Sequence, residues 1–306
     1  MSGYYDLRKE MVDRQIRARG VRDPLVLGAM GHVPREHFVP DHLKDQAYRD
    51  GPLPIDADQT ISQPYIVAYM IEALALKGGE KVLEIGSGYA AAVLAEIAGE
   101  VYAIERHGTL AARASAALQG AGYTNVHIFH GDGTRGWEDE APFDAILVSA
   151  GAPFLPETLK SQLVTGGRMV VPVGSDPRAQ ELVRVTRRDK GQFGRENLAD
   201  VRFVPLIGEQ GWEGELEDVQ TAPPRLIQHR PRQAEVLPGL IRAHAEPLEV
   251  ERHIQCVCVE TNRHIELEAC SDRDAETRRS AKGDKASGRI DRPAGRLQRA
   301  VQGNRH

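Results

Sequence analysis

Residues 81–105 read KVLEIGSGYAAAVLAEIAGEVYAIE, and this stretch predicts the fold of the chain. It opens with a short apolar run, 82–85, which is typical of a strand buried in a parallel sheet. Gly86-Ser87-Gly88 then supplies a sharp turn at which backbone can approach a ligand closely. Helix-forming residues follow, and a second short strand, 101–104, leads to Glu105. A strand–turn–helix–strand unit with an acid at the second strand's tip is the layout that binds a nucleoside through its ribose hydroxyls.

The charge beside the turn bears on which nucleoside cofactor is bound. A dinucleotide fingerprint needs a third glycine, and that position holds Ala91, so an ordinary tight turn without a ligand is the competing interpretation. Glu84 would repel a pyrophosphate but would tolerate or attract a cation. S-adenosyl-L-methionine carries a sulfonium and an ammonium and no phosphate. The pattern therefore favours this cofactor over NAD, with Glu84 among its binding residues.

Composition limits the possible partners. The 306 residues carry a formal net charge of -5, which gives no reason to expect a nucleic-acid partner. No apolar run approaches the roughly 20 residues of a membrane helix, and the charged start of the chain lacks a signal peptide's apolar centre. The three cysteines all lie late in the chain and cannot form a disulfide framework. We expect a cytoplasmic monomer without membrane partners.

The segments before residue 81 predict helices and a connector rich in proline. Apolar residues at helical spacing predict a helix over 7–19 that ends at Gly20, and Asp23-Pro24 begins a second helix that reaches Met30. Prolines make 33–40 an irregular segment.

A third predicted helix has its first turn at Pro64 and runs to Leu76, with Ser62 as its N-cap. Capping is the ordinary role for Ser62. A helix N-terminus with a free hydroxyl is also a good site for a carboxylate, because its amides and its dipole favour anions.

Strands and helices alternate after residue 105. The predicted helices are 109–120 and 155–163, and the predicted strands are 126–129, 143–148, 168–173, 181–186 and 200–206, the last two as an antiparallel edge pair. This order predicts an α/β fold, a doubly wound and mostly parallel sheet with helices on both faces. Asp132, in the turn after 126–129, is either an acceptor for an adenine amino group or an ordinary turn residue.

Several segments together resemble the protein-L-isoaspartate (D-aspartate) O-methyltransferase family. The resemblance covers roughly residues 5–212, and TISQP is its most distinctive element. The matching segments are VPREHFVP (33–40), YRDGPLPI (48–55), QTISQPYIVAYM (59–70), VLEIGSGYAAAVLAEI (82–97), VYAIER (101–106), GDGT (131–134), FDAILVSAGAP (143–153), GGRMVVPVG (166–174) and VRFVPLIG (201–208).

The resemblance implies a Rossmann-like methyltransferase fold and a set of site residues. By this similarity Ser62 corresponds to the active-site serine. The implied substrate-binding residues are Ile61, Ser62, Gln63 and Pro64. The implied cofactor-binding residues are Gly86, Gly88, Glu105, Asp132 and Gly133. No metal is expected.

The implied activity is transfer of a methyl group from S-adenosyl-L-methionine to the α-carboxylate of L-isoaspartyl and D-aspartyl residues in damaged proteins. In the family, the ester then closes to a succinimide, which starts repair. A free α-carboxylate has a pKa of about 3.5 and is already ionised at neutral pH, so Ser62 need only orient it. Alignment of the reacting groups can contribute on the order of 7–11 kcal/mol.

One departure keeps alternatives open. The family's turn reads E-x-G-x-G-x-G-Y, and residues 84–89 are two residues shorter. With a shortened turn, the chain could instead be a non-catalytic or weakly active protein that binds the cofactor or an isoaspartyl peptide. A methyltransferase for another substrate is a further alternative, and a dehydrogenase is disfavoured by Glu84 and the missing glycine.

The chain after residue 212 changes in character. We expect a methyltransferase domain over 1–212, divided into a helical substrate-side region (1–77) and a cofactor-binding core (78–212). Residues 213–306 have few apolar runs and a basic end, so a poorly structured extension is expected there, with at most a short helix at 237–245 and a strand at 254–259. Its histidines and cysteines fit no strong zinc spacing.

Overall fold

The protein is described by a computed structural model that covers residues 3–86 and 88–214. Its centre is a seven-stranded sheet in the order β5-β4-β3-β6-β7-β8-β9, in which the first five strands run parallel and the last two close one edge antiparallel. The strands are β3 (Lys81–Ile85), β4 (Glu100–Glu105), β5 (Val126–His130), β6 (Phe143–Val148), β7 (Leu163–Asp176), β8 (Ala179–Arg187) and β9 (Phe193–Val201). The predicted doubly wound, mostly parallel sheet is confirmed.

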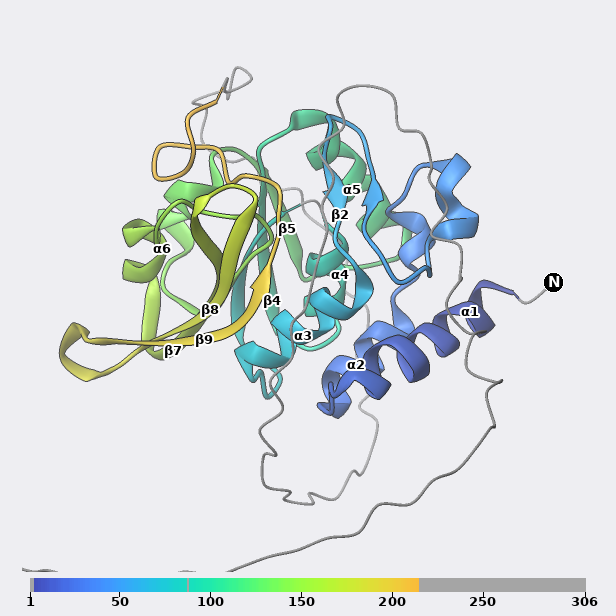
Figure 1. The fold of residues 1–306 in the computed structure, drawn as a ribbon, viewed down its shortest axis with the longest axis horizontal. Coiled ribbons are helices and arrows are strands. Elements are labelled where there is room, and N and C mark those ends of the chain that lie inside the picture. The colour runs from blue at the N-terminus through green and yellow to red at the C-terminus, as the bar shows by residue number, and fades with distance from the viewer. Residues whose placement is uncertain (1–2, 87, 215–306) are drawn as a thin grey trace, which may run out of the picture. The chain divides into compact units, whose positions relative to one another are not determined.

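Helices cover both faces of this sheet. They are α1 (Tyr4–Glu10), α2 (Pro24–His32), α3 (Pro64–Leu74), α4 (Tyr89–Ala95), α5 (Gly108–Gly120) and α6 (Glu157–Ser161). Helices α3 and α4 contact the strands directly, and α2 packs against both of them. In Figure 1 the blue N-terminal helices α1 and α2 lie on the side opposite the yellow-green strands β7 to β9.

Alternation along the strands produces two apolar cores, because successive side chains point to opposite faces. Val82 and Val101 face the core that contains α2, α3 and α4. Leu83 and Tyr102, their neighbours in sequence, face the core that contains Trp137. The near-continuous apolar runs predicted as buried strands are therefore covered on both sides.

The N-terminal helical prediction is confirmed. Helix α1 continues through a wider turn, Met11–Ile16, and a tight final turn that ends at Gly20, whose φ of +106° is left-handed. Asp23 caps α2 by accepting a hydrogen bond from the Leu25 amide at 2.8 Å. A small antiparallel ribbon of β1 (Leu53–Pro54) and β2 (Thr60–Ile61) then leads into α3.

Several boundaries differ from the predictions, and β7 is longer at both ends than the predicted strand 168–173. The N-cap of α3 is Gln63, so Ser62 is not the cap, and the helix ends at Leu74 rather than Leu76 because Ala75 turns left-handed. Helix α6 is only Glu157–Ser161, since the chain enters β7 at Leu163. The last strand is not 200–206 but β9, which pairs with β8 as far as Val201.

The tail predictions from residue 215 onward lie outside the described residues, and the domain boundary after residue 212 stays a prediction. Within residues 3–86 and 88–214, no helix has the length and apolar character needed to cross a bilayer.

Candidate cofactor and substrate site

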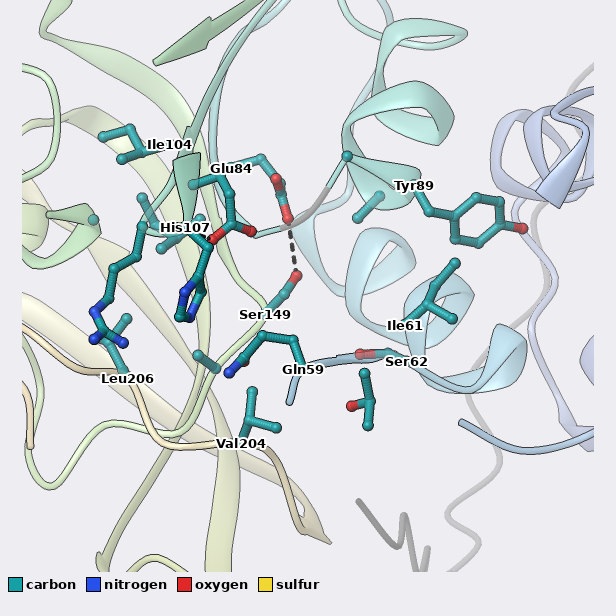
Figure 2. A pocket seen from close by; sticks show the side chains of 18 of the residues that line it. Gln59, Ile61, Ser62, Glu84, Tyr89, Ile104, His107, Ser149, Val204 and Leu206 are labelled. Atoms are coloured by element: carbon teal, nitrogen blue, oxygen red, sulfur yellow. Dashed lines mark hydrogen bonds between the residues drawn. The ribbon is translucent and has the colours of Figure 1, made fainter. Parts of the chain in front are cut away.

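A cavity of about 290 Å³ opens at the carboxyl ends of β3, β4 and β6. From β3 the chain proceeds to β4 and β5 on one side, and then crosses to β6 and β7 on the other. Such a reversal of strand order leaves a crevice at the strand ends, where ligands bind in open α/β sheets. The volume is near the lower end of small-molecule sites, roughly 300–1,000 Å³. Figure 2 shows the side chains that line it.

Most of the predicted site residues meet at this cavity. Those that line it are Ile61, Ser62, Glu84, Gly88, Glu105 and Gly133. Those that do not are Gln63, Pro64, Gly86 and Asp132. Gln63 instead donates a hydrogen bond to Asp50 at 2.7 Å, which ties the start of α3 to the preceding connector.

Glu84 is a fully buried carboxyl group on the cavity wall. Burial raises its pKa most, a hydrogen bond from Ser149 lowers it and the neighbouring charge of Glu105 raises it, and the net result is a pKa of about 8. Among the described residues, none hydrogen-bonds its Oε2. A buried acceptor without a partner is costly, so this oxygen is suited to a cationic or N–H-bearing ligand group.

Glu105 ends β4 and lines the same cavity. Burial raises the pKa of its carboxyl group, while the backbone amides of His107 and Arg106 lower it. The His107 amide donates to Oε1 at 2.8 Å and so fixes the orientation of the carboxylate. An oriented acid at the tip of the second strand is what ribose binding requires.

Gly88, which precedes α4, lines the cavity. This residue has a φ of +106°, and a Cβ there would lie 2.6 Å from the Cβ of Ala114, so the position needs glycine. Tyr89 begins α4 directly afterwards. The Arg35 guanidinium lies 4.9 Å from its ring centroid, and the Phe38 ring packs on it edge-on. The proline-bounded segment 33–40 therefore holds the turn in place.

Ser62 lies between β2 and α3 and lines the cavity on the side away from Glu84 (Figure 2). Since Gln63 is the N-cap, the hydroxyl of Ser62 does not cap α3. The first turn of α3 begins with Pro64, and the helix dipole makes this side favourable for an anion. The cavity thus has an acidic wall and an anion-favouring wall.

The Asp132 carboxylate is engaged within the protein. It accepts hydrogen bonds from the Thr134 amide and hydroxyl and, at 2.9 Å, from the Glu209 amide. Glu209 belongs to residues 204–212, here called the wall segment, which contributes Val204 and Leu206 to the cavity. Its predicted contact with adenine stays a prediction.

The wall segment is fastened along its length. The Leu206 amide donates to the Gly151 carbonyl at 2.8 Å, and the Trp212 indole N–H donates to the same carbonyl at 2.9 Å. The sequence analysis assigned the start of this segment to a strand at 200–206 and therefore missed its position beside the cavity.

Two further lining residues were also missed. Ser149 follows β6, and His107 follows β4 (Figure 2). Both come directly after the carboxyl end of a parallel strand, and this position is the signal that could have identified them.

Comparisons with known proteins point to one family. The family model for protein-L-isoaspartate(D-aspartate) O-methyltransferase matches residues 6–211. Protein-L-isoaspartate O-methyltransferase 1 of Rhodopseudomonas palustris (strain HaA2) is 64% identical over 207 residues, which are 67% of this chain and 84% of that relative.

Solved structures agree with this match. A protein-L-isoaspartate O-methyltransferase superposes with a TM-score of 0.60 at 29% identity, covering 67% of each chain. A Plasmodium falciparum protein described as the same enzyme, in complex with S-adenosyl-L-homocysteine, has a TM-score of 0.58 at 26% identity and covers 68% of this chain and 99% of its own.

Proposed function

The chain belongs to the protein-L-isoaspartate (D-aspartate) O-methyltransferase family, and on that premise we propose that it methylates the α-carboxylate of L-isoaspartyl and D-aspartyl residues in damaged proteins. The ester so formed closes to a succinimide and starts repair. The observation that carries this proposal is the single cavity that is lined both by Glu84 and Glu105, at the ends of β3 and β4, and by Ser62, just before α3.

The acidic wall fits S-adenosyl-L-methionine. Glu84 Oε2 is buried and has no partner within the described residues, so it suits the ammonium group. Glu105, held by the His107 amide, suits the two ribose hydroxyls. When bound, the cofactor supplies the methyl group and a thioether leaving group.

The opposite wall suits the substrate carboxylate. Ser62 donates its hydroxyl hydrogen to one carboxylate oxygen and so points the other oxygen toward the acidic wall. The carboxylate is ionised at neutral pH, so no residue has to remove a proton. The wall segment lines the cavity with the apolar side chains of Val204 and Leu206, which favour exclusion of water. The rate enhancement then comes mainly from alignment, on the order of 7–11 kcal/mol.

Transfer of labelled methyl groups tests the proposal. The full chain is incubated with S-adenosyl-L-methionine carrying a labelled methyl group, and with either an isoaspartyl peptide or its aspartyl counterpart. We expect label only in the isoaspartyl peptide. Cofactor binding without transfer would instead support a non-catalytic binder, and equal transfer to both peptides would indicate another substrate.

The cellular setting is part of the same proposal. The three cysteines are too few for a disulfide framework, which supports action on isoaspartyl proteins in the reducing cytoplasm, and we propose that the chain acts there as a monomer. Size-exclusion chromatography with light scattering tests the monomer directly.

A further inference from the structure

Ser149 and Glu84 form a contact across the switch point of the sheet. The Ser149 hydroxyl donates to Glu84 Oε1 at 3.0 Å (Figure 2). Ser149 is itself fixed by the end of β3, since its amide donates to the Ile85 carbonyl at 2.9 Å. The side-chain carboxyl group of Glu84, in β3, is thus held by Ser149, which follows β6.

Close packing leaves this contact little freedom. A Cβ on Gly86 would lie 2.3 Å from Glu84 Oε1 and 3.0 Å from the Ser149 Cβ. Only glycine fits at position 86, because the Glu84 carboxyl group and the Ser149 side chain occupy the space that a Cβ would need. The hydrogen bond holds one carboxyl oxygen, and the other, Oε2, has no partner among the described residues.

We propose that Ser149 is a positioning residue, which holds Glu84 so that its second oxygen receives the ammonium group of the cofactor and which favours the ionised carboxylate. This inference rests on the proposed function, because it assigns a role to Ser149 only if S-adenosyl-L-methionine occupies the cavity.

The charges around Glu84 determine in which direction loss of Ser149 shifts the pH dependence of ligand binding. Burial and the Glu105 charge raise the pKa of Glu84, and the Ser149 hydrogen bond lowers it. The other titratable groups that line the cavity are Arg106 and His107 after β4 and Tyr89 on α4. A carboxyl group that is partly protonated near neutral pH must release its proton when it receives a cation. Removal of the Ser149 hydroxyl should therefore raise the pKa of Glu84, so that proton release on ligand binding extends to higher pH.

The test is calorimetric titration of S-adenosyl-L-homocysteine into the full chain from pH 6 to pH 9, in buffers of different ionisation enthalpy. For Ser149→Ala we expect roughly tenfold weaker binding at pH 7. We also expect its affinity–pH midpoint to lie above that of the wild type, and more protons to be released per ligand at pH 8. Ser149→Thr, which keeps the hydroxyl, should restore all three quantities.

Ser161→Ala is the matched control, because Ser161 is exposed and, within the described residues, its hydroxyl bonds only the Thr158 carbonyl in the same helix. If Ser149→Ala does not fold, Ser149→Cys replaces it, and its weak donor should produce a smaller shift in the same direction. Wild-type affinity and pH midpoint in Ser149→Ala would overturn this inference alone. Weaker binding with an unmoved midpoint would also overturn it, because that result marks a merely structural serine. A wild-type protein that binds no ligand would overturn the proposed function, and this inference with it.

Discussion

The Glu209 amide donates a hydrogen bond to the Asp132 carboxylate across 2.9 Å, and this contact joins the turn after β5 to the wall segment. Gly208 lies so close that a Cβ on it would be 2.0 Å from Asp132 Oδ1. One side of the cavity therefore depends on a residue without a side chain, more than seventy positions along the chain from the carboxylate it approaches.

Gly208→Ala should loosen the wall segment. The added methyl group cannot fit against the carboxylate, and overpacking of this kind costs about 1–3 kcal/mol. We expect a lower melting temperature, faster proteolysis after Leu206 and weaker binding of S-adenosyl-L-homocysteine. Gly28→Ala is the control, because it lies in helix α2 with nothing within 4 Å of its added Cβ. That variant should be as stable as the wild type or more stable. Equal melting curves for both variants would contradict the tight contact.

Ser62→Ala should separate chemistry from cofactor binding. Loss of a hydrogen bond to a charged group is worth about 1.5–3 kcal/mol, so we expect kcat/KM for an isoaspartyl peptide to fall about tenfold to a hundredfold. The affinity for S-adenosyl-L-homocysteine should stay unchanged, because the serine lies on the side of the cavity away from Glu84. Stability should also be unaffected, since the hydroxyl does not cap α3. Undiminished methyl transfer would remove the role proposed for Ser62.

Glu84→Gln should change how stability depends on pH. In the folded protein the pKa of Glu84 is about 8, above its usual value of 4.5. The folded state therefore holds a proton that the unfolded state has lost, and the stabilisation from this group is present below pH 4.5 and is lost as the pH rises through 8.

The neutral glutamine cannot ionise, so the variant should not lose this stability as the pH rises. The melting temperature of Glu84→Gln, measured without ligand, should gain on the wild type progressively from pH 5 to pH 8.5. Glu138→Gln, at an exposed residue of the short helical turn Glu138–Glu140, serves as a control for charge removal. Parallel pH profiles for the wild type and Glu84→Gln would show that the buried carboxyl group titrates normally.

Glu105→Ala should remove recognition of the ribose. The wild type should bind S-adenosyl-L-homocysteine more tightly than its 2′-deoxy analogue, because the carboxylate accepts a hydrogen bond from that hydroxyl. In the variant the two ligands should bind equally and weakly. Calorimetry with both ligands and both proteins forms a double-mutant cycle. A preference for the ribose that survives in Glu105→Ala would assign recognition to another residue.

The buried part of the fold could be predicted from the sequence. Strand β6 begins and ends where its apolar run does, because both of its faces pack against cores. Strand β9 could not be predicted, because its pairing with β8 leaves most of its side chains in solvent and its apolar pattern is weak. The helix predicted over 155–163 is too long at its end, because Leu163 already belongs to β7 and pairs with Phe143 of β6.

The candidate site divides in the same way. Glu84, Gly88 and Glu105 were found because strand ends and glycine turns leave local patterns. The contact between Glu84 and Ser149 joins residues 65 positions apart, and only the parallel pairing of β3 with β6 brings them together. The cap of α3 was misassigned by one residue because serine and glutamine both occur before Pro64, and propensity favours serine.

The crossing of the chain from one half of the sheet to the other has a consequence for the protein as a catalyst. Ser62 precedes the first strand of the sheet, the two acids end its first two strands, Ser149 comes after the crossing, and the wall segment follows the last strand. No contiguous fragment carries a working subset of these groups. Loss of pairing between β3 and either of its neighbours should therefore separate these groups, and we expect methyl transfer to disappear together with the native sheet when the protein is unfolded.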